Sequence, residues 1–302
     1  MSKRIVVLGD GAWGKALAHV TAKAGNHVSH WSRSNPEIPT DVDAAIIAVP
    51  AQAVRSVIIS TAGFLPPVII SAAKGIERET GNTIAEVVKG ILPHTEFYAL
   101  SGPSFAADVL AGLPTAITLA GPNLENATFW AKALMLPHFR IYASDDVTGV
   151  EIGGAMKNVL AIACGISDAQ GLGESARAGL ITRGFAELSR YGRKRGAKPE
   201  TLMGLSGLGD LLLTSASTKS RNYSFGLAIG KGLSVAEAIE HSRGVVEGAY
   251  TASIAAKLAH QHQVDMPIVN AVAAIIDGHS NPRNEIAKLM ARPAGPEIKQ
   301  EH

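Results

Sequence analysis

The chain has little of several residue types whose abundance would define its class. The single cysteine among 302 residues, Cys164, excludes an internal disulfide. Its apolar neighbours favour a buried small residue over a catalytic thiol, and a lone thiol suits a reducing compartment. Lys and Arg number 28 against 26 Asp and Glu. So small a surplus of positive charge does not indicate a basic surface that would bind nucleic acid.

Long apolar segments are also missing. No stretch approaches the roughly 18 apolar residues of a membrane span. The apolar run 5–8 is too short for a signal peptide and leads into a glycine turn. We therefore expect a cytoplasmic protein without a membrane span. The hydrophobic fraction of 46% and the charged fraction of 18% are typical of a globular chain, and its length is sufficient for two domains.

The periodicity of apolar residues changes near residue 146. Before it, apolar runs predict strands over 4–8, 27–31, 44–49, 68–71, 97–100, 115–119 and 140–142, with helices between several of them. This alternation predicts an α/β, Rossmann-type, doubly wound sheet over residues 1–146. After it, helices are predicted over 149–167, 175–191, 199–203, 223–230, 235–241, 251–262, 267–277 and 282–291. We therefore expect an all-α C-terminal domain over 147–302.

The start of the chain has the glycine pattern of a nucleotide-binding turn. Gly9-Asp10-Gly11-Ala12-Trp13-Gly14 has the G-x-G-x-x-G spacing. Gly9 permits a tight turn, Gly11 lets a pyrophosphate approach the backbone, and Gly14 lets the helix pack on the strand. The pattern follows a buried strand and opens a helix, which favours a dinucleotide site over an ordinary strand–helix turn.

The residues after the second strand bear on the choice of dinucleotide. NAD-selective sites usually have an acidic residue here to hold the ribose hydroxyls, whereas this chain has Ser32-Arg33-Ser34. Arg33 is suited to a 2′-phosphate, and the competing interpretation is an exposed loop arginine. We expect NADP(H), or NADP(H) and NAD(H) used with little discrimination.

Two loops of small residues follow predicted strands. Ser71-Ala72-Ala73-Lys74-Gly75-Ile76 places Lys74 just after one strand, and Ser101-Gly102-Pro103-Ser104-Phe105-Ala106 follows the next. Open α/β sheets bind ligands at the carboxyl ends of their strands. Either loop alone could be an ordinary turn, but two such loops at one edge favour a functional interpretation.

In the second half, Lys157 and Asn158 lie side by side in an otherwise apolar segment, 155–166. Burial lowers the pKa of a lysine, and a lysine with a pKa near neutrality is a good acid–base group. The alternative is a lysine at the end of an element, with its ammonium group in water. Asp210 stands between glycines and leucines. If it is buried it needs a partner, for which Lys157 is the obvious candidate, and the alternative is a helix N-cap.

Ser220-Arg221-Asn222 stands at a predicted helix start. Arg221 offers a bidentate fork suited to phosphate, although a surface loop with a capping asparagine is an equally good interpretation. Glu247 lies in the glycine-bracketed segment 243–248, where it can cap either a ligand amide or a helix.

In their order along the chain, these motifs resemble the bacterial NAD(P)-dependent glycerol-3-phosphate dehydrogenase family. The similarity extends almost from end to end. The matching motifs are the glycine pattern with Trp13, the Lys74-Gly75 loop, and segments 101–106, 154–159, 207–211, 220–222, 245–248 and 266–268.

The resemblance implies a Rossmann domain followed by a helical substrate domain, with Lys157 as the proton acceptor. The substrate would lie among Lys74, Gly102, Ser104, Asp210, Ser220, Arg221 and Asn222. With Gly9, Gly11 and Gly14, the cofactor contacts would be Trp13, Arg33, Lys74, Ala106, Arg221, Val245 and Glu247. Family members are commonly homodimers, and no metal is expected.

The implied reaction is the reversible oxidation of sn-glycerol 3-phosphate to dihydroxyacetone phosphate, which supplies a glycerophospholipid precursor. Two alternatives stay open. One is a β-hydroxyacid dehydrogenase with the same two-domain plan, against which Asp210 and Ser220-Arg221-Asn222 argue. The other is a non-catalytic dinucleotide-binding sensor, which would need no lysine in its second domain.

One feature departs from the family. The chain is short between Arg33 and Asp41, where relatives usually have a longer helical excursion. We therefore expect an altered wall on the adenine side of the cofactor, and no change in the catalytic groups.

Overall fold

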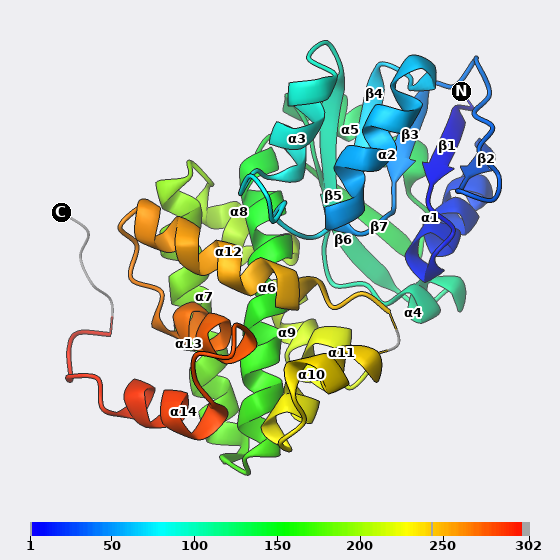
Figure 1. Ribbon diagram of the computed structural model, residues 1–302. Coiled ribbons are helices and arrows are strands. Elements are labelled where there is room, and N and C mark those ends of the chain that lie inside the picture. The colour runs from blue at the N-terminus through cyan, green and yellow to red at the C-terminus, as the bar shows by residue number, and fades with distance from the viewer. Residues whose placement is uncertain (1, 243, 298–302) are drawn as a thin grey trace.

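The computed structural model describes residues 2–242 and 244–297. Arg243 and the last residues of the predicted helical domain, 298–302, therefore lie outside the described residues. A sheet covered by helices is followed by a domain made of helices, and the two lie against each other (Figure 1).

The sheet has seven strands in the order β2-β1-β3-β4-β5-β6-β7. These are β1 (Arg4–Leu8), β2 (His27–Trp31), β3 (Ala44–Ile47), β4 (Val68–Ser71), β5 (Glu96–Ser101), β6 (Thr115–Ala120) and β7 (Phe139–Ser144). The first five run parallel, β6 is antiparallel to β5, and β7 is parallel to β6. All the predicted strands are present, and the mostly parallel Rossmann-type sheet is confirmed.

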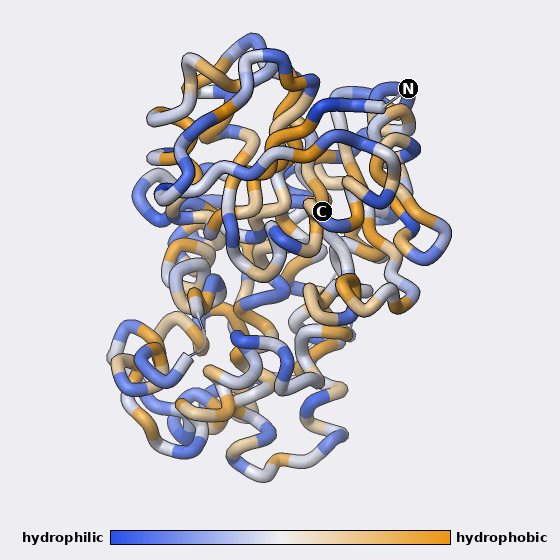
Figure 2. Tube along the Cα trace, turned by 90° about the vertical axis from the view of Figure 1, so that its right-hand side faces the viewer, coloured by the Kyte–Doolittle hydropathy of each residue, from blue (hydrophilic) through white to orange (hydrophobic). Residues whose placement is uncertain are grey.

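Both faces of the sheet are buried, which explains the continuous apolar runs of its strands. Ile5 and Val7 of β1 face α1 (Ala12–Lys23), α4 (Ala106–Leu110) and α5 (Leu124–Leu134). Val6 and Leu8 face α2 (Val54–Thr61) and α3 (Ile84–Ile91) on the other side. Figure 2 shows apolar residues concentrated along the strands, inside this pair of helical layers.

Every predicted helix of the second half is present. The elements are α6 (Val147–Ala169), α7 (Gly173–Lys194), α8 (Pro199–Met203), α9 (Asp210–Thr214), α10 (Arg221–Gly230), α11 (Val235–Glu240), α12 (Glu247–Gln261), α13 (Pro267–Ile276) and α14 (Pro282–Met290). A π-helical turn, η3 (Leu205–Gly209), leads into α9; neither was predicted. Because β7 ends at Ser144 and α6 begins at Val147, we keep residue 146 as the proposed domain boundary.

Helix α6 runs through the middle of the helical domain (Figure 1). It is the one helix of the described residues with the length and composition of a membrane span, but its apolar window is entirely enclosed by protein. Helix α10 lies directly on it, because Gly165 faces the carbonyl oxygen of Tyr223 and Gly226 faces that of Ile162. A side chain at either glycine would push the two helices apart. These contacts set the position of α10 relative to Lys157.

Two buried glutamates hold helix starts in place. Glu151 of α6 accepts a hydrogen bond from the amide of Ala85 (2.8 Å) in α3, which joins the two domains. Glu187 of α7 accepts from the amides of Ile268 (2.8 Å) and Val269 (3.1 Å), directly after Pro267 at the start of α13. Burial raises the pKa of both carboxyl groups to about 7. The Met266-Pro267-Ile268 motif is thus a capped helix start inside the helical domain.

Candidate active site

The glycine pattern forms the turn between β1 and α1. Gly9 has a φ of +121°, a conformation that favours glycine, and a Cβ on Gly14 would collide with the Gly9 carbonyl oxygen. Gly11 is the N-cap of α1 and has open space where its side chain would be. This open approach to a helix N-terminus is what a pyrophosphate requires.

Two buried polar atoms near this turn fit a bound dinucleotide. Among the described residues, neither Nε1 of Trp13 nor Oε2 of Glu247 has a hydrogen-bond partner. The other Glu247 oxygen accepts from the amide of Ala51 (2.9 Å), which begins the short 3-10 turn after β3. Burial raises the pKa of Glu247, although the Ala51 amide and Arg221 act against this. Buried polar atoms without partners are uncommon in proteins, and six others occur among the described residues; a bound ligand would give these two a partner.

The other predicted cofactor contacts differ in exposure and in the elements that carry them. Ala106 begins α4, after the loop that follows β5, and is partly buried. Val245 lines a pocket of about 250 Å³ with Ile239, Gly244, Val246, Ala249 and Tyr250. Arg33 is exposed, in a tight turn closed by paired backbone hydrogen bonds between Ser32 and Asn35. From this turn to β3 the described chain forms no helix.

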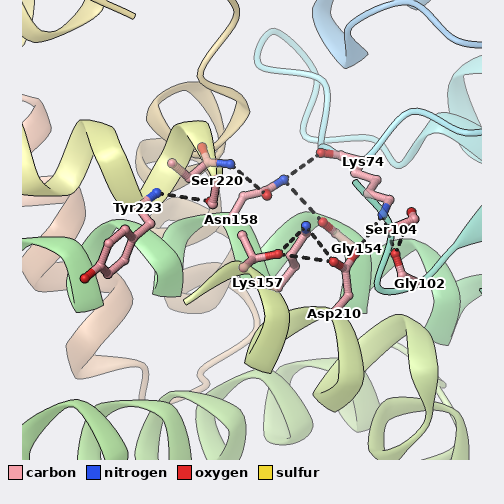
Figure 3. A network of polar contacts seen from close by, with 11 residues as sticks. Lys74, Gly102, Ser104, Gly154, Lys157, Asn158, Asp210, Ser220 and Tyr223 are labelled. Atoms are coloured by element: carbon pink, nitrogen blue, oxygen red, sulfur yellow. Dashed lines mark hydrogen bonds and ion pairs between the residues drawn. The ribbon is translucent and has the colours of Figure 1, made fainter. Parts of the chain in front are cut away.

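The centre of the site is one carboxylate shared by two lysines (Figure 3). Asp210 is 1% exposed. Its Oδ1 accepts from Nζ of Lys157 at 2.9 Å, and its Oδ2 accepts from Nζ of Lys74 at 2.7 Å. Lys157 lies in the middle of α6 and is 7% exposed. The alternatives of a lysine at a helix end and of an aspartate N-cap are therefore wrong for these residues.

Burial and the neighbouring charges of this cluster change the pKa of Lys157. Burial lowers the pKa of Lys157 to about 8, with Lys74 and Arg221 acting in the same direction and Asp210 against it. Burial alone would raise the pKa of Asp210, but the two ammonium groups outweigh it and hold that pKa below its usual value. Lys157 can therefore exchange a proton near neutral pH, and the site keeps a surplus of positive charge.

The loop after β5 is tied to the same cluster. Nζ of Lys74 also donates to the carbonyl oxygen of Gly102 at 2.9 Å, and the hydroxyl of Ser104 donates to that oxygen at 3.1 Å. Gly102 has a φ of +148°, and a Cβ there would meet Ile117. The two loops predicted at this edge of the sheet are thus brought together.

A row of amides connects Lys74 to the start of α12, and Figure 3 shows its first step, from Lys74 to Asn158. Asn158 donates to the carbonyl oxygen of Lys74 (3.1 Å) and accepts from Nδ2 of Asn222 (2.9 Å). Asn222 in turn accepts from the amide of Gly248 at 2.8 Å. Asn222 was predicted to contact the substrate directly, but both ends of its amide already have protein partners.

The other two residues of the Ser220-Arg221-Asn222 motif, Ser220 and Arg221, differ in their contacts. The Ser220 hydroxyl accepts from the amide of Tyr223 (3.2 Å) and so caps α10. Arg221 is exposed at the first position of that helix, and its guanidinium lies beside Gly244. Of the three residues, only Arg221 is exposed, while Ser220 and Asn222 are buried.

Two residues of this network were not predicted. Thr214 donates to Oδ1 of Asp210 (3.2 Å), and Nζ of Lys157 donates to its hydroxyl (2.8 Å). Its spacing of four residues from Asp210 in a helix would have placed it on the same face. Asn158 was seen only as a neighbour of Lys157. Among the residues described, no group of three His, Cys, Asp or Glu side chains has the arrangement of a metal site.

Comparison with known proteins agrees with this geometry. The model of the NAD-dependent glycerol-3-phosphate dehydrogenase C-terminus matches residues 146–287. The model of the corresponding N-terminus matches 4–40 and 37–127. The second match is divided at 37–40, within the short segment between Arg33 and Asp41.

The full-length relatives are bacterial. Glycerol-3-phosphate dehydrogenase [NAD(P)+] of Brucella canis is 44% identical over 326 aligned positions, covering 97% of this chain and 98% of the relative. The protein of that name from Methylobacterium radiotolerans is 47% identical and covers 96% of each chain. An alignment of 326 positions is longer than this chain of 302 residues, so the relatives have residues that this chain lacks.

Solved structures give the same result. The crystal structure of glycerol-3-phosphate dehydrogenase from Coxiella burnetii has a TM-score of 0.89 and 35% identity, covering 96% of this chain and 99% of that one. A D-mandelate dehydrogenase has a TM-score of 0.63 at 13% identity, which shows a shared fold alone. The matched models and the relatives together show that the chain belongs to the NAD-dependent glycerol-3-phosphate dehydrogenase family.

Proposed function

We propose that the protein catalyses the reversible NAD(P)-dependent oxidation of sn-glycerol 3-phosphate at C2 to dihydroxyacetone phosphate. The observation that supports this most strongly is the buried cluster of Lys157, Asp210 and Lys74, with Arg221 at its edge. In this proposal the enzyme is a cytoplasmic homodimer that supplies a precursor of glycerophospholipids.

Lys157 is the proposed proton acceptor. With a pKa of about 8, a useful fraction of Lys157 is neutral at slightly alkaline pH and takes the proton of the C2 hydroxyl. Asp210 and Thr214 hold Nζ through hydrogen bonds of 2.9 and 2.8 Å, which fixes its position for this transfer. In the reverse direction the ammonium form returns the proton to the carbonyl oxygen.

The phosphate group is proposed to bind at the start of α10. Arg221 offers two parallel N–H donors, and the first turn of a helix has amides that the helix itself does not use. Ser220 and Asn222 keep this helix start in place through their protein contacts. Lys74, Gly102 and Ser104 lie on the other side of the substrate in this proposal.

The cofactor is proposed to lie on the turn Gly9–Gly14, with Trp13, Arg33, Ala106, Val245 and Glu247 around it. When bound, its nicotinamide accepts the hydride from C2. The open backbone at Gly11 and the unpaired Nε1 of Trp13 and Oε2 of Glu247 support this placement.

The direct test is to mix the purified protein with NADPH and dihydroxyacetone phosphate and follow the loss of reduced-nicotinamide absorbance. Turnover that needs both compounds supports the proposal. Turnover of β-keto acids in place of dihydroxyacetone phosphate would identify a β-hydroxyacid dehydrogenase. Binding of NADPH without turnover of either substrate would identify a sensor.

Replacing the proposed base should separate chemistry from cofactor binding. Lys157→Ala should lower kcat by at least about 10²-fold, the lower range for a positioned acid–base group, while NADPH affinity, measured by fluorescence titration, stays nearly unchanged. Lys157→Arg should not restore activity, because arginine is not deprotonated at the working pH. A folded Lys157→Ala enzyme with near-normal kcat would exclude Lys157 as the base.

Replacing the proposed phosphate anchor should affect phosphorylated substrate selectively. Arg221→Ala should raise the KM for dihydroxyacetone phosphate and also lower kcat, since phosphate binding positions C2. The measurement is kcat/KM for dihydroxyacetone phosphate and for unphosphorylated dihydroxyacetone, in both enzymes. An equal loss on the two substrates would show that Arg221 is not the anchor.

Cofactor preference should depend on Arg33. We expect NADPH to be used at least as well as NADH, because no acid follows β2 to repel a 2′-phosphate. In Arg33→Ala, kcat/KM should fall more for NADPH than for NADH. A strong preference for NADH, or an unchanged ratio in the variant, would mean that Arg33 does not contact the 2′-phosphate.

A further inference from the structure

An ion pair connects the two domains next to the proposed phosphate anchor. Nζ of Lys219 donates to Oδ1 of Asp108 at 3.0 Å, across 111 residues of sequence. The same ammonium lies 5.8 Å from the ring centre of Phe105. The side chains of Lys219 and Asp108 are 60% and 31% exposed. The ion pair therefore lies at the surface, where dissolved salt screens it.

On the helical side, the pair is linked to Arg221 by a short, ordered turn. The amide of Lys219 donates to the hydroxyl of Ser217 (3.2 Å), and the amide of Ser220 donates to the Ser217 carbonyl (2.9 Å). The hydroxyl of Ser224 in α10 donates to the carbonyl of Thr218 (2.9 Å). A displacement of Lys219 therefore moves the start of α10, where Arg221 is the first residue.

On the Rossmann side, the pair is linked to the lysine cluster. Asp108 lies in α4, and its amide donates to the carbonyl of Phe105 (3.0 Å). The loop before Phe105 is held by Lys74, which donates to Gly102. The pair thus spans from the loop that Lys74 holds to the turn that carries Arg221.

We propose that Lys219 and Asp108, with Phe105 beneath the ammonium group, are positioning residues that set the separation between the phosphate anchor and the Lys74 loop. They do not touch the substrate. By joining the two sides they place Arg221 at the distance from Lys157 that glycerol phosphate spans. The proposal rests on the proposed function, and its specific consequence is an effect on KM for the phosphorylated substrate.

The test is steady-state kinetics with NADPH and dihydroxyacetone phosphate for wild type, Lys219→Met and Asp108→Asn. Each variant should raise KM roughly two- to fivefold, the range that an exposed ion pair provides, with a smaller fall in kcat of less than about twofold. The double variant should resemble either single one. The charge exchange of Lys219→Asp with Asp108→Lys should return KM toward wild type.

A matched control is the ion pair of Lys198 and Asp145, at 2.7 Å and with side chains 52% and 48% exposed. Lys198 is the N-cap of α8, and α8 and α4 lie on opposite sides of the junction (Figure 1). Lys198→Met should leave KM unchanged. In about 0.5 M NaCl, which screens exposed charges, the KM values of Lys219→Met and wild type should converge.

Asp108→Asn distinguishes positioning from simple attraction of the phosphate. If Lys219 acted only as a distant positive charge, removing the negative charge of Asp108 would lower KM. A lower KM in Asp108→Asn, no change in Lys219→Met, or an equal rise in Lys198→Met would each overturn the proposal. If the proposed function fails, the wild-type enzyme shows no turnover in this assay. If wild type is active and the variants behave in one of these ways, only the positioning role is overturned.

Discussion

The arrangement of this protein depends on one buried carboxylate that neutralises ammonium groups from two domains. Asp210 binds Lys157 of α6 and Lys74 of the loop after β4 at 2.9 and 2.7 Å. Each of these charges, buried alone, would cost on the order of several kcal/mol. Together they fix the loop after β4, the middle of α6 and the start of α9 relative to one another. While Lys157 is protonated, two positive charges share one negative charge, and the cluster is a favourable place for an anion.

The rest of the site extends from this cluster through neutral hydrogen bonds. Asn158 and Asn222 link the Lys74 carbonyl to the start of α12. Glycines at the contact of α6 and α10 bring the two backbones together without side chains between them. Arg221 is therefore held at a defined place although its own side chain is exposed. In the proposed function, the charged groups attract the phosphorylated substrate, while packing and hydrogen bonds hold those groups in place.

The sequence predicted the sheet, the helices and the pairing of Lys157 with Asp210, because each leaves a local signal. Apolar periodicity indicates the elements, and a carboxylate buried among leucines requires a partner. The bond of Lys74 to Asp210 spans 136 residues, and no local pattern indicates it. The internal use of the Asn222 amide was missed for the same reason, since Gly248 reaches it only in the folded chain. The sequence also indicated that the segment after Arg33 is shorter than in relatives. The family model matches in two parts that meet at 37–40, which agrees with residues missing from this segment.

The most direct test of this account is the pH dependence of glycerol 3-phosphate oxidation, with the inflection of kcat/KM as the measured quantity. In the proposed mechanism the neutral form of Lys157 is the active one, so in wild type kcat/KM should rise as the pH increases through about 8. Asp210 raises the pKa of Lys157 and Lys74 lowers it. The inflection should therefore move to lower pH in Asp210→Asn and to higher pH in Lys74→Met. Inflections that stay in place, or that both move in one direction, would contradict the claim that this cluster sets the pKa of the catalytic lysine.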